Sequence, residues 1–233
     1  MRKKDSEENS LNSKLSRKII EGAKEFKVKE LPSSVMFQLH NDPKHLGFLL
    51  ARHKVVGKLL SGKDNVLEIG CQDGFGTYLV SKYVEKITAI DIEKKHIVEA
   101  KKVWKEFAHR IKFQNIDITK SKYLGSFDSI YMLDVFEHIS PRKSTSFLKA
   151  IIRHMSDNAL LIVGMPTKES QIYASKLSKL GHVNLFSIFE ARKYFNEFFD
   201  NVLVFGMNDE MINLNFEPLN HYMICICIGP KKL

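Results

Sequence analysis

A short segment, Val66 to Thr77, constrains the fold of this chain most strongly and reads VLEIGCQDGFGT. Apolar and β-branched residues lead into Glu68, and an apolar periodic run begins at Tyr78. Between them lie the glycines Gly70, Gly74 and Gly76. This pattern predicts a buried strand, a glycine-rich turn and the start of a helix, which together present backbone N–H groups to a ligand. Glycine suits such a turn because it permits positive φ and close approach of the ligand.

The glycine spacing separates two classes of ligand-binding loop. A dinucleotide fingerprint would place glycines at positions 70, 72 and 75, but this chain has Gln72 and Phe75 at the last two. Instead, an acidic residue lies two positions before the first glycine, and further glycines follow four and six positions after it. This arrangement resembles the first motif of class I S-adenosylmethionine-dependent methyltransferases, an E/D-x-G-x-G-x-G pattern around the methionine half of the cofactor. Gln72 stands where that family usually has its middle glycine, and we expect a negative φ there.

The central part of the chain alternates predicted strands with predicted helices, which indicates a parallel, doubly wound sheet. Five strands are expected, at residues 65–69, 86–90, 111–116, 128–133 and 159–163. Two β-rich runs follow, at 201–205 and 222–228, and their connection leaves no room for a crossover helix, so they should pair antiparallel. The expected fold is α/β: a Rossmann-like, mostly parallel sheet of seven strands with a reversed C-terminal strand. This too resembles the class I methyltransferase fold, over roughly residues 63–229.

Two helices are expected before the glycine-rich segment. Apolar residues recur with helical spacing from Leu11 to Phe26, residues 27–37 should form a linker, and a second helix should run from Pro43 to Gly62. We therefore divide the chain into an N-terminal tail and helical cap, residues 1–62, and a methyltransferase domain, residues 63–233. Two interpretations of the helices stay open: they cap the cofactor site, or they simply pack against the sheet.

The composition limits the compartment and the partners. Hydrophobic residues make up 44% of the chain and charged residues 27%, as in a globular protein, and no apolar run is long enough to span a bilayer. The three cysteines Cys71, Cys225 and Cys227 lack zinc-like spacing and are expected to pack in the interior of a protein from a reducing compartment. We expect a cytoplasmic protein without a membrane partner. The net charge of +9 comes from scattered lysines, so no specific nucleic-acid partner is expected.

Open α/β sheets bind ligands beyond the carboxyl ends of their strands, so the residues at those ends are the candidate site. Asp91 would accept the ribose hydroxyls, or cap the following helix. By resemblance, Asp117 would face the adenine amino group; the alternative is a turn aspartate before Thr119. The expected contacts to S-adenosylmethionine are Glu68, Gly70, Cys71, Gln72, Gly74, Asp91, Ile92, Asp117, Ile118, Leu133 and Asp134.

The sequence LDVFEH, residues 133–138, follows the fourth strand and is similar to the L-D-V-L-E-H-I stretch of many small-molecule methyltransferases. The resemblance implies that Asp134 binds the cofactor ammonium group, although it could instead cap a turn. It also implies that Glu68 hydrogen-bonds the glycine loop or approaches the same ammonium group. His138 would border the substrate or hydrogen-bond the backbone. No metal site is expected.

Methyl transfer to an alcohol benefits from a general base, for which histidine is suited. The candidates are His40, His138, His182 and His221. We favour His182, with His138 second, because residues 167–186 form a long connection without clear periodicity beyond the fifth strand. The alternative is that His182 caps the local backbone.

The sequence thus predicts an S-adenosylmethionine-dependent methyltransferase acting on a small polar molecule, such as a sugar. Two alternatives remain. The positive charge leaves room for an RNA hydroxyl methyltransferase, and Gln72 leaves room for a non-catalytic, cofactor-binding regulator.

Overall fold

The computed structural model describes residues 14–18, 20–22 and 30–231. By its internal contacts the chain divides into two units, residues 1–31 and residues 32–233, and the elements described below belong to the second. In the first unit the described residues 14–18 and 20–22 are helical. The rest of the helix expected between Leu11 and Phe26, residues 11–13, 19 and 23–26, lies outside the described residues.

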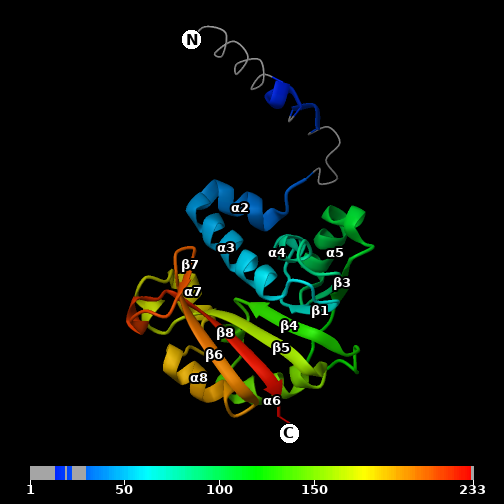
Figure 1. Ribbon diagram of the computed structural model, residues 1–233. Coiled ribbons are helices and arrows are strands. Elements are labelled where there is room, and N and C mark those ends of the chain that lie inside the picture. Colours follow the sequence, from blue (N-terminus) through cyan, green and yellow to red (C-terminus); the bar gives the residue numbers. More distant parts are fainter. Residues whose placement is uncertain (1–13, 19, 23–29, 232–233) are drawn as a thin grey trace, which may run out of the picture. The chain divides into compact units, whose positions relative to one another are not determined.

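Within the described residues, eight strands form one sheet in the order β3-β2-β1-β4-β5-β8-β6-β7 (Figure 1). The strands are β1 (Asn65–Ile69), β2 (Lys86–Asp91), β3 (Ile111–Asn115), β4 (Phe127–Leu133), β5 (Met155–Pro166), β6 (Phe199–Asn208), β7 (Met211–Asn213) and β8 (Tyr222–Pro230). β1 to β5 are parallel, and β8 runs antiparallel between β5 and β6. The predicted α/β fold with a reversed C-terminal strand is confirmed. The strand count differs by one, because β6 continues through a tight turn into β7.

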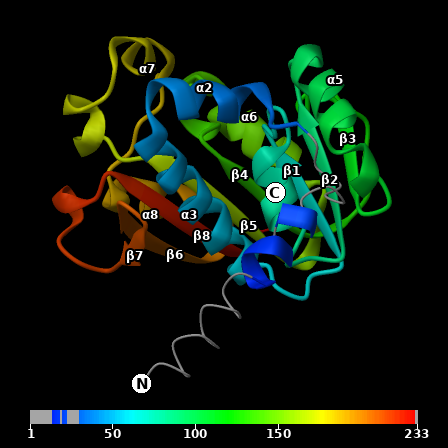
Figure 2. The ribbon, with the colours of Figure 1, turned by 90° about the horizontal axis from the view of Figure 1, so that it is seen from above.

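Helices cover both faces of this sheet (Figure 2). They are α2 (Ser33–Asn41), α3 (Pro43–Leu59), α4 (Phe75–Val80), α5 (Lys94–Val103), α6 (Pro141–Ile152), α7 (Lys176–Gly181) and α8 (Ile188–Phe195). Alternation along β1 separates the faces, since successive side chains of a strand point to opposite sides. Leu67 and Ile69 join the core cluster that contains the apolar residues of α6 and α8. Glu68 faces the other side, where it meets Thr77 of α4.

The linker expected at residues 27–37 is wrong in its second half, because α2 begins at Ser33. The N-terminus of α2 lacks a side-chain cap of its own. Instead, its first N–H groups donate to acidic side chains from other parts of the chain: Ser33 N to Glu99 Oε1 (2.7 Å) and Ser34 N to Asp73 Oδ2 (2.9 Å). These long-range bonds satisfy the groups that every helix leaves open at its start. The helix predicted from Pro43 is confirmed as α3, which packs against both α2 and α4.

The connection after β5 is more ordered than the sequence suggests. It contains a 3-10 turn, η4 (Glu169–Ile172), and the short helix α7. The capping box of Ser187 and Glu190 is confirmed: each side chain bonds the other residue's backbone N–H, at 3.2 and 2.8 Å, and α8 follows. No helix in residues 14–18, 20–22 or 30–231 has the length and apolar character that crossing a membrane requires.

Candidate active site

The glycine-rich loop between β1 and α4 folds back onto the end of β2. Gly70 N and Cys71 N both donate to Ile90 O, at 2.8 and 3.2 Å. φ is positive at Gly70 (79°), at Gln72 (48°) and at Gly74 (80°). The expected negative φ at Gln72 is therefore wrong. The reason lies outside the loop: in this conformation Gln72 N donates to Asp91 Oδ2 at 2.9 Å.

Packing against neighbouring side chains requires two glycines of the motif. A Cβ on Gly76 would lie 1.9 Å from Nε2 of His53 on α3. A Cβ on Gly74 would lie 2.5 Å from the Phe113 ring. Gly74, expected to contact the cofactor, thus lies against β3, whereas Gly70, Cys71 and Gln72 line a cavity of about 320 Å³.

Glu68 lies at the floor of this cavity, buried at the end of β1. The hydroxyl of Thr77 donates to Glu68 Oε2. Burial raises the pKa of Glu68 to about 7, because the charged carboxylate loses its water, and the bond from Thr77 offsets only part of this. A positively charged group that binds in this cavity would favour ionisation of the Glu68 carboxyl.

A second cavity, of about 610 Å³, lies beyond the ends of β2 and β3. Its lining includes five predicted cofactor contacts: Gly70, Asp91, Ile92, Asp117 and Ile118. Asp91 uses its two carboxylate oxygens to bind the N–H groups of Gln72 (2.9 Å) and Glu93 (2.8 Å), which leaves further lone pairs for a ligand.

Asp117 forms a local turn. Its Oδ1 accepts the N–H (2.9 Å) and the hydroxyl (2.6 Å) of Thr119, and its Oδ2 lies 3.2 Å from Lys120 Nζ. These hydrogen bonds, above all the one from the Thr119 hydroxyl, lower the pKa of Asp117. Asp117 therefore acts as the turn aspartate that the sequence analysis gave as the alternative, and it also lines the 610 Å³ cavity. Ile118 packs into the core, whereas Ile92 is 69% exposed.

Leu133 and Asp134 line the 320 Å³ cavity opposite the glycine loop. Asp134 has a positive φ of 55° and pairs with Arg52 of α3, with 3.1 Å between Nη1 and Oδ2. The Arg52 guanidinium also stacks over the Tyr222 ring, 3.8 Å from its centroid. Asp134, the residue predicted to bind the cofactor ammonium group, thus already pairs with the Arg52 guanidinium. Its Oδ2 lies closer to Arg52 Nη1 (3.1 Å) than its Oδ1 does (3.4 Å).

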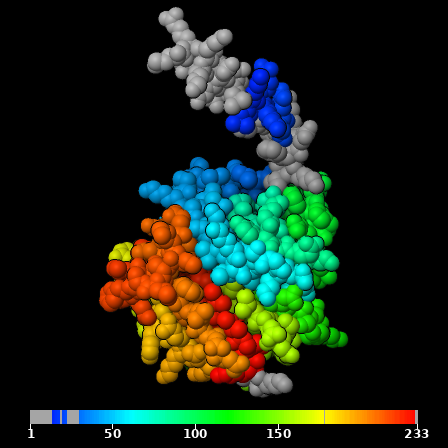
Figure 3. All heavy atoms as spheres, viewed as in Figure 1, coloured from blue at the N-terminus to red at the C-terminus, as the bar shows by residue number. Residues whose placement is uncertain are grey.

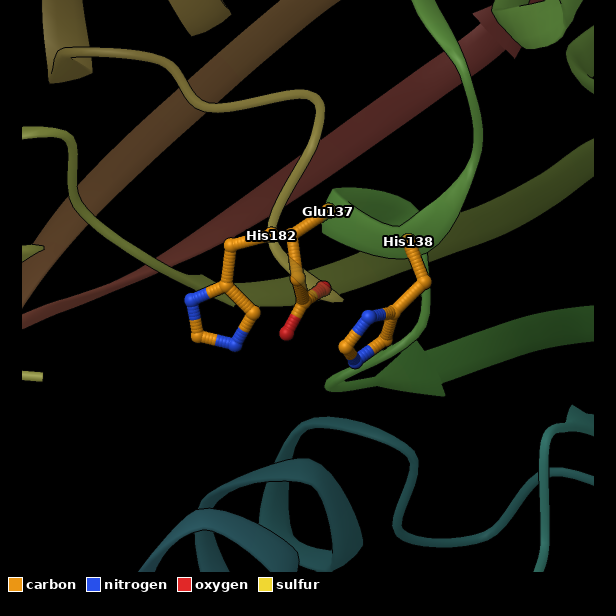
Figure 4. A group of neighbouring side chains, drawn as sticks. All are labelled: Glu137, His138 and His182. Carbon is orange, nitrogen blue, oxygen red and sulfur yellow. The ribbon is translucent and has the colours of Figure 1, made fainter. Parts of the chain in front are cut away.

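Glu137, His138 and His182 come together at the rim of the same cavity, and the Glu137 carboxylate lies between the two rings (Figure 4). His138 Nδ1 lies 2.9 Å from Gly181 O, and His182 Nδ1 lies 2.9 Å from Gln171 Oε1. Burial lowers the pKa of His182, and so does the neighbouring His138, which favours a neutral ring. The structure therefore places both predicted catalytic histidines beside the predicted cofactor residues.

A third cavity, of about 210 Å³, adjoins the 320 Å³ cavity. The two have five lining residues in common: His45, Arg52, Pro166, Ser178 and His182. The other walls of the third cavity come from η4, the β6–β7 turn and β8. On the molecular surface α2 and α3 meet the β6–β7 region (Figure 3), and His45 of α3 and Met207 of β6 both line this cavity. His221 also contributes, whereas His40 is exposed on α2.

Sequence reasoning missed Arg52 and His53. Both lie on α3 between Leu49 and Val56, a spacing that places them on the face that also carries the buried Val56 and Leu60. Two polar residues interrupting an apolar stripe are a usable signal for a functional face. His53 Nδ1 donates to Leu49 O at 2.8 Å, and burial lowers its pKa, so a neutral ring lies against Gly76.

Comparison with known proteins gives the same classification as the fold. Residues 66–158 match the family model described as a methyltransferase domain. Residues 66–158 therefore carry a methyltransferase domain, and the sheet that contains them has the class I methyltransferase fold. S-adenosylmethionine is the cofactor of such a domain, as predicted. A comparison with curated protein sequences gives no match.

Solved structures share the fold of this methyltransferase domain at low identity. N-methyltransferase NodS from Bradyrhizobium japonicum WM9, in complex with S-adenosyl-L-homocysteine, is 16% identical, with a TM-score of 0.59 over 83% of this chain and 91% of its own. The methyltransferase domain of bacterial CtHen1-C is 19% identical, with a TM-score of 0.63 over 79% of this chain and 98% of its own. The plantazolicin methyltransferase BpumL, in complex with S-adenosyl-L-homocysteine, is 16% identical, with a TM-score of 0.62 over 85% of this chain and 89% of its own.

Proposed function

We propose that the chain transfers the methyl group of S-adenosylmethionine to a hydroxyl group of a small polar molecule, such as a sugar. The observation that carries this proposal is the succession of three cavities. The 610 Å³ cavity shares Gly70 and His138 with the 320 Å³ cavity, which in turn shares His182 with the 210 Å³ cavity. A ligand that fills the first two therefore ends beside a ligand in the third.

In this proposal the adenosine half lies in the 610 Å³ cavity and the methionine half in the 320 Å³ cavity. Asp91 accepts the ribose hydroxyls, and Asp117 and Ile118 border the adenine with Ile92. Glu68 faces the ammonium group, whose positive charge lowers the cost of ionising a buried carboxylate. The loop residues Gly70 to Gln72 and the Leu133–Asp134 pair enclose the rest.

The proposed domain division assigns α2 and α3 to a cap over these cavities. α2 and α3 would form the cap of the cofactor site, because Ser34, Gln38, His45 and Leu49 line the 320 Å³ cavity from above the glycine loop. Asp73 links this cap to the loop through Ser34 N. The cap would exclude water from the reacting centre, which favours transfer to the acceptor over side reactions.

The 210 Å³ cavity suits a small, hydroxylated acceptor. Tyr173, His221 and Tyr222 supply ring faces and edges, and Arg52 and Asp209 supply hydrogen-bonding charges. Such a mixture of aromatic and polar groups fits a molecule with apolar C–H faces and polar substituents. The cavity is too small for a long single strand of nucleic acid, and none of the described residues that line it is a lysine.

The bound cofactor supplies a methyl group that its sulfonium has already activated, so the protein's task is alignment and proton removal. His182 lies at the border of the cofactor and acceptor cavities. Because its pKa is lowered, its ring is neutral at neutral pH and can promote loss of the acceptor's hydroxyl proton.

Calorimetry with S-adenosyl-L-homocysteine and a methyl-transfer assay with labelled S-adenosylmethionine test the proposal. We expect micromolar binding, and labelled product from at least one member of a panel of sugars and polyols. If the label is transferred to RNA and to no small molecule, the acceptor is RNA and the proposed small-molecule acceptor is wrong. Binding without transfer to any acceptor would support the regulatory alternative.

A further inference from the structure

We propose that Glu137, His138 and His182 bind a divalent cation that takes nitrogen and oxygen ligands, such as Mn²⁺, Co²⁺ or Zn²⁺. The three residues each offer a ligand atom, and these atoms lie within 4.8 Å of one another. Ligands about 2.0–2.2 Å from a bound ion lie up to roughly 4 Å apart. Small side-chain rotations therefore bring the three groups around one ion.

The carboxylate of Glu137 is the strongest sign that something binds here. Its side chain is 1% exposed, and neither Oε1 nor Oε2 has a hydrogen-bond partner within the described part of the chain. A buried carboxylate without partners is costly, because burial removes its water without replacing it. In Figure 4 the carboxylate points between the two imidazole rings, where a cation would compensate for the lost hydration.

Both imidazoles are fixed by a hydrogen bond at Nδ1. Gly181 O can only accept a hydrogen bond, so His138 Nδ1 carries the proton and Nε2 keeps its lone pair. His182 Nδ1 contacts Gln171 Oε1, and Gln171 Nε2 donates to Thr167 O at 3.3 Å, which fixes the amide orientation. His182 Nε2 therefore also keeps its lone pair. Histidine ligands commonly use their second nitrogen in this way.

The backbone holds the two halves of the cluster together. Val183 N and Asn184 N both donate to Glu137 O, at 2.9 and 3.0 Å. With the bond from His138 to Gly181 O, three hydrogen bonds join the turn after β4 to the end of α7 and the residues that follow it. The three proposed ligands are thus held close together before any ion binds.

The role of the cation, unlike its binding, rests on the proposed function. His138 and His182 place it between the cofactor and acceptor cavities, with coordination positions left open for the acceptor. A hydroxyl oxygen bound there loses its proton to solvent more readily. The oxygen then forms its bond to the methyl carbon as the carbon–sulfur bond breaks, and the sulfonium becomes a neutral thioether. His182 would promote proton loss as a ligand rather than as a direct base.

The test uses the full chain, treated with chelator and then titrated with Mn²⁺ alone, with free Mn²⁺ followed by electron paramagnetic resonance. We expect one bound ion per chain. Glu137→Gln and His182→Ala should each weaken Mn²⁺ binding by about 10–100-fold or more. His221→Ala is the matched control: His221 lines the acceptor cavity but is not one of the three proposed ligands, so the variant should leave Mn²⁺ binding unchanged.

Calorimetry with S-adenosyl-L-homocysteine on the same variants checks that each is folded and keeps cofactor affinity, so this test stands apart from that of the proposed function. His182→Ala is the safer variant if Glu137→Gln proves unstable, since His182 is only partly buried. Absence of Mn²⁺, Co²⁺ and Zn²⁺ binding by the wild type would overturn the proposal. So would a stoichiometric site with unchanged affinity in a folded His182→Ala variant.

Discussion

The backbone N–H of Gln72 donates to the side-chain Oδ2 of Asp91 at 2.9 Å and ties the glycine-rich loop to the end of β2. This bond joins two positions nineteen residues apart, and it forms while Gln72 holds a positive φ of 48°. Asp91 therefore has two tasks: it shapes the loop, and it lines the cavity proposed for adenosine. Both tasks lead to measurable consequences.

Replacing Gln72 by glycine should stabilise the protein. A left-handed backbone costs a non-glycine residue about 1–2 kcal/mol, part of which the greater freedom of glycine in the unfolded chain offsets. We expect the free energy of unfolding in urea to rise by up to about 1 kcal/mol, with cofactor affinity preserved because the Asp91 contact is made by the backbone. Gln72→Ala is the control, since alanine keeps the strain. Equal stability of the glycine and alanine variants would contradict this account.

Asp91→Ala should weaken binding of S-adenosyl-L-homocysteine and destabilise the loop. Loss of a hydrogen bond to a charged acceptor costs roughly 1.5–3 kcal/mol, which is about tenfold to over a hundredfold in affinity. Calorimetry measures the first effect and thermal denaturation the second. Asp64→Ala, at an exposed position, serves as control. An unchanged affinity in Asp91→Ala would remove this residue from the cofactor site.

Glu68→Gln should flatten the pH dependence of stability. Burial raises the pKa of Glu68 from 4.5 to about 7, so the folded state holds this proton more tightly than the unfolded state. The free energy of unfolding then falls as the pH rises from 4.5 towards 7, and this group accounts for at most about 3 kcal/mol of the fall. Above pH 7 the contribution of Glu68 is constant. Urea titrations at about pH 5 and about pH 8 should show the wild type losing more stability than Glu68→Gln. Parallel losses would show that Glu68 does not titrate in this range.

Gly76→Ala should be strongly destabilising, and removing His53 should relieve the effect. The added Cβ would lie 1.9 Å from His53 Nε2, so the His53 ring would have to move and strain its hydrogen bond to Leu49 O. A double-mutant cycle with His53→Ala measures the coupling, which for residues in contact is about 0.5–3 kcal/mol. Additive effects would mean that the clash is relieved elsewhere.

His182→Ala should lower the rate of methyl transfer by about 10²–10⁴-fold once an acceptor is known. Cofactor affinity and melting temperature should stay nearly unchanged, because the ring is only partly buried and lies at the rim of the cofactor cavity. Single-turnover kinetics provide the measurement. Normal turnover by the variant would exclude His182 from catalysis.

Much of the fold follows from local sequence signals. β1 occupies the predicted residues, and β4 differs by one residue, because buried runs bounded by turns leave few alternatives. The capping box of Ser187 and Glu190 was visible because it is a local motif. α2 was missed for the opposite reason, since the groups that satisfy its first turn, Glu99 and Asp73, lie far away in sequence.

The site shows the same division. Residues at strand ends, such as Asp91 and Leu133, could be located from the sequence because the topology fixes where strand ends meet. The positive φ of Gln72 could not be predicted from the sequence, because it accompanies a hydrogen bond to Asp91 on β2. The position of Glu137 between two histidines depends on how the segment after α7 packs, and no local pattern encodes that packing.

The position of β8 also determines the order in which the sheet can be completed. β8 lies between β5 and β6, although it follows both in sequence. Until β8 forms, each of these strands presents an unpaired edge, and such edges invite pairing with other chains. Completion of the sheet is therefore a late event that closes contacts between distant residues, which slows folding. During synthesis, the β8-facing edges of β5 and β6 therefore stay open until residues 222–230 have been added.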